Sequence, residues 1–407
     1  MRYSILLIVC GMEIKVKYTE KIKIFIKKET VLCIAVILAC ISTFFVFPDK
    51  KYSGYIDYRV IVLLFALMTI MEGFKSTGLF EKIAVLFLKK VSNFRQLLIV
   101  LILICFFSSM LITNDVALIT FVPFTIMVLH MADLYKEIMP VIIMETVSAN
   151  LGSMATPVGN PQNLYIYSVS SMNIYDFLKI MAPVSVLALI IIILFCFIHK
   201  NYRIEVCISE KTDISADKRN RNNIENALLG ILFVLSLLSV FRIMSWKILL
   251  IVILVGSLII KGLCKEKYLP FKADFALLFT FAAFFVFIGN VGRIEAVTEV
   301  LKKIINGREM ILSFGCSQVI SNVPAAILLS GFTDNFSELL LGVNIGGLGT
   351  LIASLASLIS YKFFIQEHQK EYDKHMEIGT KGRYILWFTI VNISIAAILL
   401  VITYMCL

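Results

Sequence analysis

The chain has 407 residues, of which 59% are hydrophobic and only 16% are charged, and its formal net charge is +10. A soluble globular chain averages roughly 45–50% apolar and about 25% charged residues, so this composition excludes that class. Long, continuous apolar runs indicate an all-α polytopic membrane protein in a lipid bilayer, and Lys and Arg in cytoplasmic loops explain the positive charge without nucleic acid as a partner.

The first half begins with a basic segment at 1–29, which we predict to be a cytoplasmic tail whose translation starts at Met1 or at Met12. The first membrane half then occupies 30–198. Within it we expect an interfacial amphipathic helix at 78–92 and a broken apolar hairpin at 94–131. Its spans are expected at about 30–48, 58–74, 137–165 and 176–198.

A polar and basic cytoplasmic linker is predicted at 199–224, and the second membrane half follows at 225–407. A second amphipathic stretch at 293–305 precedes a second broken apolar segment at 308–332. The spans of this half are expected at about 225–243, 246–262, 272–290, 338–361 and 384–406. With the N-terminus in the cytoplasm, this order leaves the C-terminus outside.

A short polar motif occurs once in each half. Ser109–Asn114 reads S-x-x-x-T-N and Ser317–Asn322 reads S-x-x-x-S-N, and both copies lie in apolar runs where hydrocarbon offers polar groups no water. A second pair follows, because Asn150–Thr156 and Asn344–Thr350 carry Asn, Gly and Thr at identical offsets. Two ordered matches favour two halves of one site.

The repeat predicts an inverted topology. Five expected spans separate the two broken segments, so re-entrant hairpins would enter from opposite faces of the membrane, and each would be followed by a broken transmembrane helix. The alternative is that each broken segment forms two full spans, which would place Asn114 and Asn322 near connecting loops.

Broken helices free backbone carbonyl and N–H groups, which bind cations and anions respectively. Hydroxyl, amide and carbonyl oxygens could cage a small hard cation such as Na⁺, while small residues in these positions could equally serve close helix packing. The candidate ion-coupling residues are Ser109, Thr113, Asn114, Asp115, Gly152, Ser317, Ser321, Asn322 and Gly346. The candidate substrate-binding residues are Asn114, Asn322, Thr156, Asn160, Asn163 and Thr350.

Asp115 is the sharpest single candidate, because an ionisable group at a hairpin tip within an apolar context is a functional hypothesis by default. It could couple protons, bind a cation, or cap the following helix. Its counterpart is Val323, and the polar segment 156–163 faces a less polar counterpart, so an asymmetric substrate environment is expected. Glu145 is a weaker candidate for the cavity.

With these residues in hand, the chain resembles the ion transporter superfamily over about 57–405. This group includes divalent-anion–sodium symporters, citrate transporters and arsenite permeases. The symporters carry Ser-Asn-Thr at two hairpin tips, where this chain has Thr113-Asn114-Asp115 and Ser321-Asn322-Val323. The resemblance implies a scaffold domain, a mobile transport domain, elevator-type alternating access, a homodimer and sodium sites. Both third-position Thr residues are missing, and the two segments look more like the arsenite-permease branch.

The expected function is that of a secondary active transporter in the cytoplasmic membrane. It would move a small anion, such as citrate, a dicarboxylate or an inorganic oxyanion, with Na⁺ or H⁺ as the coupling ion and no other cofactor. The alternatives are a Na⁺/H⁺ antiporter and an arsenite efflux permease. We expect no enzyme activity, because the chain has no HExxH, GxSxG or Walker A motif.

Overall fold

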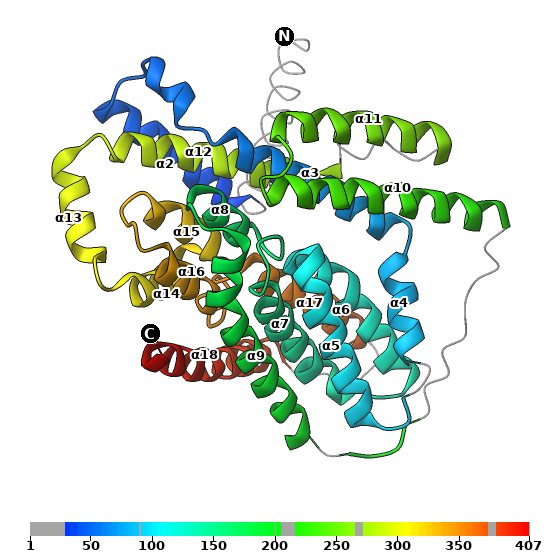
Figure 1. The fold of residues 1–407 in the computed structure, drawn as a ribbon. Helices are drawn as coiled ribbons and strands as arrows, with labels where there is room; N and C mark the ends of the chain where they lie inside the picture. The colour runs from blue at the N-terminus through cyan, green and yellow to red at the C-terminus, as the bar shows by residue number, and fades with distance from the viewer. Residues whose placement is uncertain are drawn as a thin grey trace, which may run out of the picture. The chain divides into compact units, whose positions relative to one another are not determined.

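The computed structural model describes residues 29–88, 91–199, 201–204, 216–264, 272–372 and 380–406. In these ranges every regular element is helical, and the one β-type contact is an isolated bridge between Asn93 and Arg203 (Figure 1). The prediction of an all-α chain is therefore confirmed for this part. The predicted tail up to residue 28, the choice between Met1 and Met12, and 205–215 of the predicted linker lie outside the described residues.

The elements before the linker follow the predicted order, with η denoting short 3-10 helices. They are α2 (Thr30–Phe45), η1 (Lys50–Gly54), α3 (Tyr58–Ser76), α4 (Leu79–Leu88), α5 (Phe94–Ile112), α6 (Asn114–Met131), η2 (Tyr135–Glu137), α7 (Ile138–Ser153), α8 (Pro161–Val169) and α9 (Ile174–Ile198). The predicted amphipathic stretch is α4, and the segment predicted at 137–165 is split between α7 and α8, as its glycines and prolines suggested.

After the linker come α10 (Ala216–Val240), α11 (Trp246–Cys264), α12 (Phe275–Val291), α13 (Glu295–Ile305), α14 (Glu309–Ile320), α15 (Asn322–Ser330), α16 (Phe336–Ile345), α17 (Leu355–Tyr372) and α18 (Lys381–Cys406). The segment predicted at 338–361, expected to be the second broken helix, is divided between α16 and α17. The non-helical stretch is 346–354, where Gly349 takes a φ of +120° that disfavours other residues.

Two predicted polar segments also contain helix. The last part of the linker, from Ala216 on, belongs to α10, and α17 continues to Tyr372 into a region expected to be a basic loop. In α17 the apolar run ends while residues with good helix propensity continue without Pro or Gly. In α10 the polar residues come before the apolar run and also contain no Pro or Gly. Hydropathy therefore marks the limit of the membrane segment rather than the limit of the helix.

Six helices of the described part are long and apolar enough to cross a bilayer: α5, α6, α9, α10, α11 and α18. A seventh span results if α12 and α13, which meet at a bend of 105°, are counted as one. A multi-pass membrane protein is therefore supported. The helix α2 is shorter, with 16 residues, and α3 is not among the six, so crossings at 30–48 and 58–74 stay predictions.

The described residues divide into two compact units, which we treat separately. The smaller contains 29–57 and 274–298. Within it α2 packs along α12, where Asn290 Nδ2 donates to Ser42 Oγ at 2.9 Å. Beyond the end of α12, Arg293 Nη2 pairs with Asp49 Oδ2 at 2.9 Å. The remaining described residues form the larger unit, which contains all the candidate site residues.

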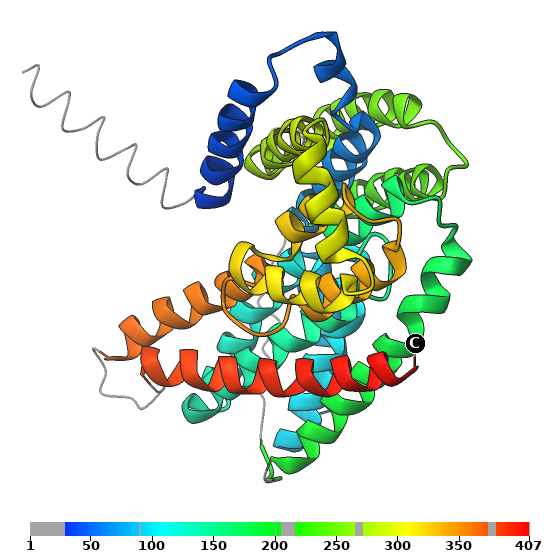
Figure 2. The same ribbon diagram turned by 90° about the vertical axis from the view of Figure 1, so that its left-hand side faces the viewer.

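The centre of the larger unit is α7, which packs against α5, α6, α9 and α17 (Figure 1). Apart from Pro140, every residue of α7 is buried, and α16 is likewise buried from Leu339 to Ile345. The helix α16 packs against α8, α14 and α15. The helix α18 packs against α9 (Figure 2). Tyr384 of α18 stacks on Phe364 of α17 with ring centroids 4.4 Å apart. The two buried helices α7 and α16 carry the two repeated asparagines into the interior.

Candidate functional site

Both predicted helix breaks are present, and each depends on one residue with nearly the same backbone conformation. Thr113, between α5 and α6, has φ 70° and ψ 149°, and Ser321, between α14 and α15, has φ 76° and ψ 153°. A non-glycine residue at positive φ is strained by on the order of 1–3 kcal/mol, so surrounding contacts must hold it there. The matched strain at two matched positions marks these junctions as built features of the fold.

The residue after each junction is hydrogen-bonded to the non-helical segment that follows later in the same half. These segments, 154–160 between α7 and α8 and 346–354 between α16 and α17, are called the chain breaks. Asn114 N donates to Gly159 O at 3.1 Å, and Asn322 N donates to Ala353 O at 2.9 Å. Both asparagines begin a helix, and both bonds run through the main chain. Each hairpin tip is therefore fixed against a non-helical segment of its own half.

The side chains of Asn114 and Asn322 are also arranged alike. Each is 4% exposed, and each Oδ1 accepts the next backbone N–H, from Asp115 at 3.0 Å and from Val323 at 2.9 Å. The Nδ2 of Asn114 donates in addition to Asn150 Oδ1 at 2.9 Å. These two predicted ligands therefore lie at the tips, and both orient the first turn of a helix.

Close helix packing joins the helix before each junction to a buried helix: α5 packs against α7, and α14 packs against α16. A Cβ on Gly152 would collide with the Phe106 carbonyl and the Ser109 hydroxyl, and one on Gly346 would lie 2.8 Å from Ser317 Oγ. The Ser109 and Ser317 hydroxyls donate to carbonyls of their own helices at 2.9 and 2.7 Å. The small-residue packing role, left open by the sequence, is therefore present at all four predicted positions.

The two halves meet through a network of buried amides. Asn344 of α16 accepts from Asn160 Nδ2 at 3.0 Å and donates to Asn163 Oδ1 at 2.6 Å. Asn160 and Asn163 lie at the start of α8, and all three side chains are almost completely buried. The asparagine of the second half therefore binds the break of the first half.

The reverse contact exists as well. Asn150 of α7 accepts from Ser354 Oγ at 3.1 Å, and its Nδ2 donates to Ser357 Oγ at 3.4 Å. Ser354 and Ser357 follow Asn344 by ten and thirteen residues, as Asn160 and Asn163 follow Asn150. Two serines of the less polar segment therefore take the places of the two amides and make the mirrored contacts, while the asymmetry expected of the substrate environment stays a prediction.

The two predicted threonines also mirror each other, each anchoring its chain break to the preceding hairpin. Thr156 Oγ1 donates to Met110 O, and Thr350 Oγ1 donates to Gln318 O at 3.1 Å. Both threonines are half-buried. In this state their hydroxyls therefore act on the main chain of α5 and α14.

Sequence reasoning did not single out Gln318. Its Nε2 donates to Gly346 O and Leu348 O at 2.9 Å each, and its Oε1 accepts Thr350 N at 3.0 Å. The equivalent residue in the first half is Met110, and there Asn163 Nδ2 binds the carbonyls of the break instead, donating to Ser153 O, Met154 O and Thr156 O at 3.3, 3.2 and 3.0 Å. The signal was a glutamine inside the repeated motif, at a position where the first half has an apolar residue.

The first half has two carboxyl groups in this region. Asp115 is half-buried in the first turn of α6, opposite Val323 in the repeat. Glu145 is fully buried in α7, where Thr125 Oγ1 donates to its Oε1 at 2.5 Å and Cys105 Sγ lies 3.8 Å from the same oxygen. Among the described residues, Glu145 Oε2 has no hydrogen-bond partner. The second half has its own buried carboxyl, Glu309 of α14, which accepts from Thr333 Oγ1 at 3.0 Å, so only the carboxyl at the hairpin tip is one-sided.

The arrangement offers neutral amides and hydroxyls, two helix N-termini and backbone carbonyls of two chain breaks. Oxygens of this kind suit a hard cation such as Na⁺, and helix N-termini suit an anion. The described part of the chain holds no group of three His, Cys, Asp or Glu side chains that could bind a metal ion. The geometry therefore favours reversible binding of small ions.

Comparisons with known proteins show which family and which relatives the chain is similar to. The profile of a family described as "Citrate transporter" matches residues 19–340. An uncharacterized transporter of Methanocaldococcus jannaschii is 34% identical over 308 residues, which covers 75% of this chain and 81% of that protein. The inner membrane protein YbiR of Escherichia coli is 29% identical over 329 residues, or 79% of this chain and 84% of that protein. A putative transporter named arsB from Dictyostelium discoideum is 27% identical over 154 residues, 38% of this chain and 27% of that protein.

Proposed function

The chain belongs to the citrate transporter family, and on that premise we propose that it is a secondary active permease for a small anion, driven by a gradient of Na⁺ or H⁺. The observation that carries the proposal is the reciprocal contact of the two halves, Asn344 with the first chain break and Asn150 with the second. Paired helix breaks that meet inside a membrane protein are the usual setting of a transporter's binding site.

We propose an inverted-topology repeat in which the α5–α6 hairpin enters from the cytoplasm and the α14–α15 hairpin from outside. The short arms of the second hairpin, with 12 and 9 residues, favour re-entry, because about 18 Å and 14 Å of helix do not cross a bilayer core of about 30 Å. The arms of the first have 19 and 18 residues, and each is long enough for a full span.

Cysteine labelling tests this topology. In a cysteine-free background, cysteines placed at Asn93 and at Gly307, just before the two hairpins, should react with an impermeant maleimide from opposite sides of the membrane. Labelling of both from the same side would exclude an inverted repeat. If the second hairpin is re-entrant, a cysteine at Asp334, after that hairpin, should be labelled from the same side of the membrane as the cysteine at Gly307.

For the coupling ion we propose oxygens of the two tips, at Thr113 with Asn114 and at Ser321 with Asn322, as Na⁺ ligands when the site opens. The half-buried Asp115 and the buried Glu145 are the candidates for proton coupling, since an ionisable group inside a membrane segment is costly and marks ion pathways. The elevator motion, the homodimer and the position in the cytoplasmic membrane, with the C-terminus outside, belong to the same proposal.

Reconstitution tests the function. Purified protein in proteoliposomes should take up labelled citrate, succinate, phosphate or arsenite only under an imposed Na⁺ or H⁺ gradient. Uptake that needs no gradient would contradict secondary active transport. Exchange of Na⁺ for H⁺ that requires none of these solutes would support the antiporter instead.

An efflux permease for a small hydroxylated solute such as arsenite is the second candidate. One observation favours it, because the amide and hydroxyl network at Asn150 and Asn344 includes no Lys, Arg or His that would attract a multiply charged anion. A rice protein named silicon efflux transporter is 31% identical over 135 residues, 33% of this chain and 27% of that protein. Extrusion of arsenite from loaded vesicles, with no citrate uptake, would select this candidate.

A further inference from the structure

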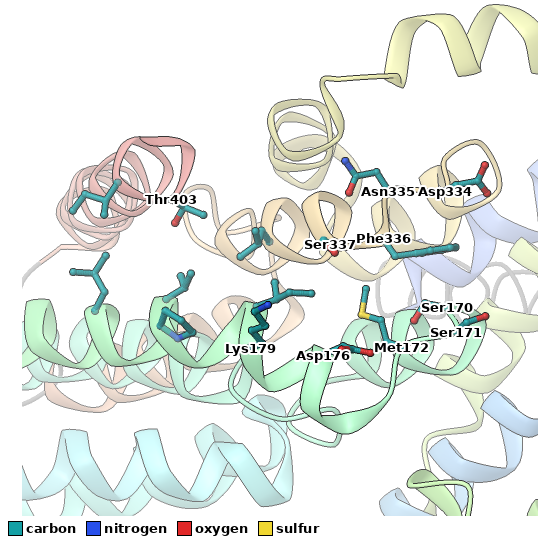
Figure 3. Close-up of a pocket in the computed structure, with 16 residues that line it drawn as sticks. Ser170, Ser171, Met172, Asp176, Lys179, Asp334, Asn335, Phe336, Ser337 and Thr403 are labelled. Carbon is teal, nitrogen blue, oxygen red and sulfur yellow. The ribbon is translucent and has the colours of Figure 1, made fainter. Parts of the chain in front are cut away.

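A groove of about 1030 Å³ lies in the larger unit between α9, α16 and α18, apart from the amide network. Figure 3 shows its two ends. Ser170 and Ser171, which precede α9, lie at one end, and Thr403 of α18 lies towards the other. The volume of the groove is close to the upper limit of the usual range for ligand pockets, and one side of the groove is open. Its size exceeds what a small inorganic anion needs.

The polar end of the groove carries three charged side chains. Lys179 extends from α9 towards α16, Asp176 lies one turn earlier on α9, and Asp334 precedes α16 (Figure 3). All three are exposed, and Lys179 makes no ion pair with another described residue. One cation and two carboxylates suit a partner that has both a negative and a positive group, and they disfavour a partner with only negative charge.

The rest of the groove is apolar. Pro183, Val184 and Leu187 of α9 line one side, Leu341 of α16 lines another, and Ile402 comes from α18. Pro183 has no N–H, so the carbonyl one turn before it, at Lys179, loses its helical donor next to the polar end. An apolar channel that leads away from a charged end matches an amphiphile rather than a soluble substrate.

The depth of the groove matches one leaflet. From Asp176 to Leu187 the helix α9 rises by about 16 Å, which is close to half of a hydrocarbon core of about 30 Å. Lys179 can extend towards the headgroups while its stem lies on the apolar wall. In the proposed topology the start of α9, the start of α16 and the end of α18 share the outer side, so the leaflet is the outer one.

We propose that this groove binds a bilayer phospholipid with a zwitterionic, primary-amine headgroup of the ethanolamine type. Its phosphate meets Lys179, its ammonium faces Asp176 and Asp334, and one acyl chain lies along Pro183–Leu187. The site is separate from the amide network, and the binding of the lipid does not depend on which solute the protein transports.

Native mass spectrometry of the full chain tests the proposal. Protein released from nanodiscs with equal phosphatidylethanolamine and phosphatidylglycerol should retain the ethanolamine lipid by about tenfold over the glycerol lipid, the equivalent of about 1.4 kcal/mol. Leu187→Trp, which fills the apolar channel, should abolish this retention. The matched control is Val186→Trp on the adjacent outward face, where Val186 is 56% exposed, and it should retain the lipid as the wild type does.

A second pair of variants tests the polar end. Lys179→Gln should reduce retention of the ethanolamine lipid to the level of the glycerol lipid, while Lys247→Gln, at the start of α11 outside the groove, should not. Water-soluble glycerophosphoethanolamine should give no thermal stabilisation, because the acyl chain is part of the binding.

Three results would overturn the proposal. Equal retention in wild type and Leu187→Trp would show that no lipid occupies the groove, and preference for phosphatidylglycerol would refute the headgroup assignment. A dimer that becomes monomeric in Leu187→Trp with unchanged lipid would assign the groove to a second copy of the chain. None of these readouts measures transport, so a failed transport proposal leaves this test valid.

Discussion

Replacing Asn344 with alanine removes the side chain through which the second half binds the chain break of the first. Asn344 donates to Asn163 Oδ1 at 2.6 Å and accepts from Asn160 Nδ2 at 3.0 Å. The Asn160 amide keeps a second acceptor, Ser153 Oγ at 3.2 Å, so it loses only part of its bonding. Asn163 Oδ1 is left buried without the Asn344 donor.

The loss in stability follows from these contacts. Hydrogen bonds between helices in membrane proteins contribute about 0.6 kcal/mol each on average. A buried acceptor that loses its donor costs about 1–3 kcal/mol. Asn344→Ala should therefore lower the free energy of unfolding by about 2–4 kcal/mol, and the pair with Asn160→Ala should show a coupling energy of about 0.6–1.7 kcal/mol.

The assay is reversible unfolding in mixed detergent micelles, with Asn392→Ala as the matched control. Asn392 is fully buried in α18, but its Nδ2 donates within its own helix, to Phe388 O at 2.8 Å. Its replacement should change stability by less than about 1 kcal/mol. If Asn344→Ala is no more destabilising than Asn392→Ala, or if the cycle with Asn160 shows no coupling, the contact between the halves has no energetic role and the reasoning fails.

Three further changes test the packing and the carboxyl groups. Gly152→Ala should destabilise the protein by at least about 1–3 kcal/mol in the same assay, because the added Cβ collides with the Phe106 carbonyl. The control Gly230→Ala, which has open space around it, should stabilise the protein by up to about 1 kcal/mol. Equal effects of the two substitutions would refute the close α5–α7 contact. Asp115→Asn should remove the pH dependence of flux, and flux that keeps its pH dependence would leave Asp115 as a helix cap only. Glu145→Gln should fold, since Thr125 can still donate to the remaining carbonyl oxygen, but should lose proton-driven uptake; unaltered uptake would make Glu145 structural.

Sequence reasoning located the two chain breaks because an amide is costly within an apolar run, and here two amides stand at equivalent positions of a repeat. It placed Asn114 and Asn322 at helix junctions and paired Asn150 with Asn344, and the structure has all four in these places. Their roles as ion or substrate ligands stay predictions.

The partners across the halves could not be predicted in the same way. Ser354 and Ser357 look like ordinary small residues of a helix interface, and only the fold brings them to Asn150. Gln318 was overlooked because its counterpart, Met110, is apolar, so the comparison of repeats concealed it. The extent of α17 was missed because hydropathy falls where helix propensity does not.

The most direct test of the account is gradient-driven uptake by proteoliposomes that contain Asn114→Ala, Asn322→Ala, Asn392→Ala or the unchanged protein at equal density. The account predicts uptake by the unchanged protein and by Asn392→Ala, and none by either tip variant, because one asparagine from each half is required. Full uptake by Asn114→Ala or by Asn322→Ala would contradict a single site built from two matched halves.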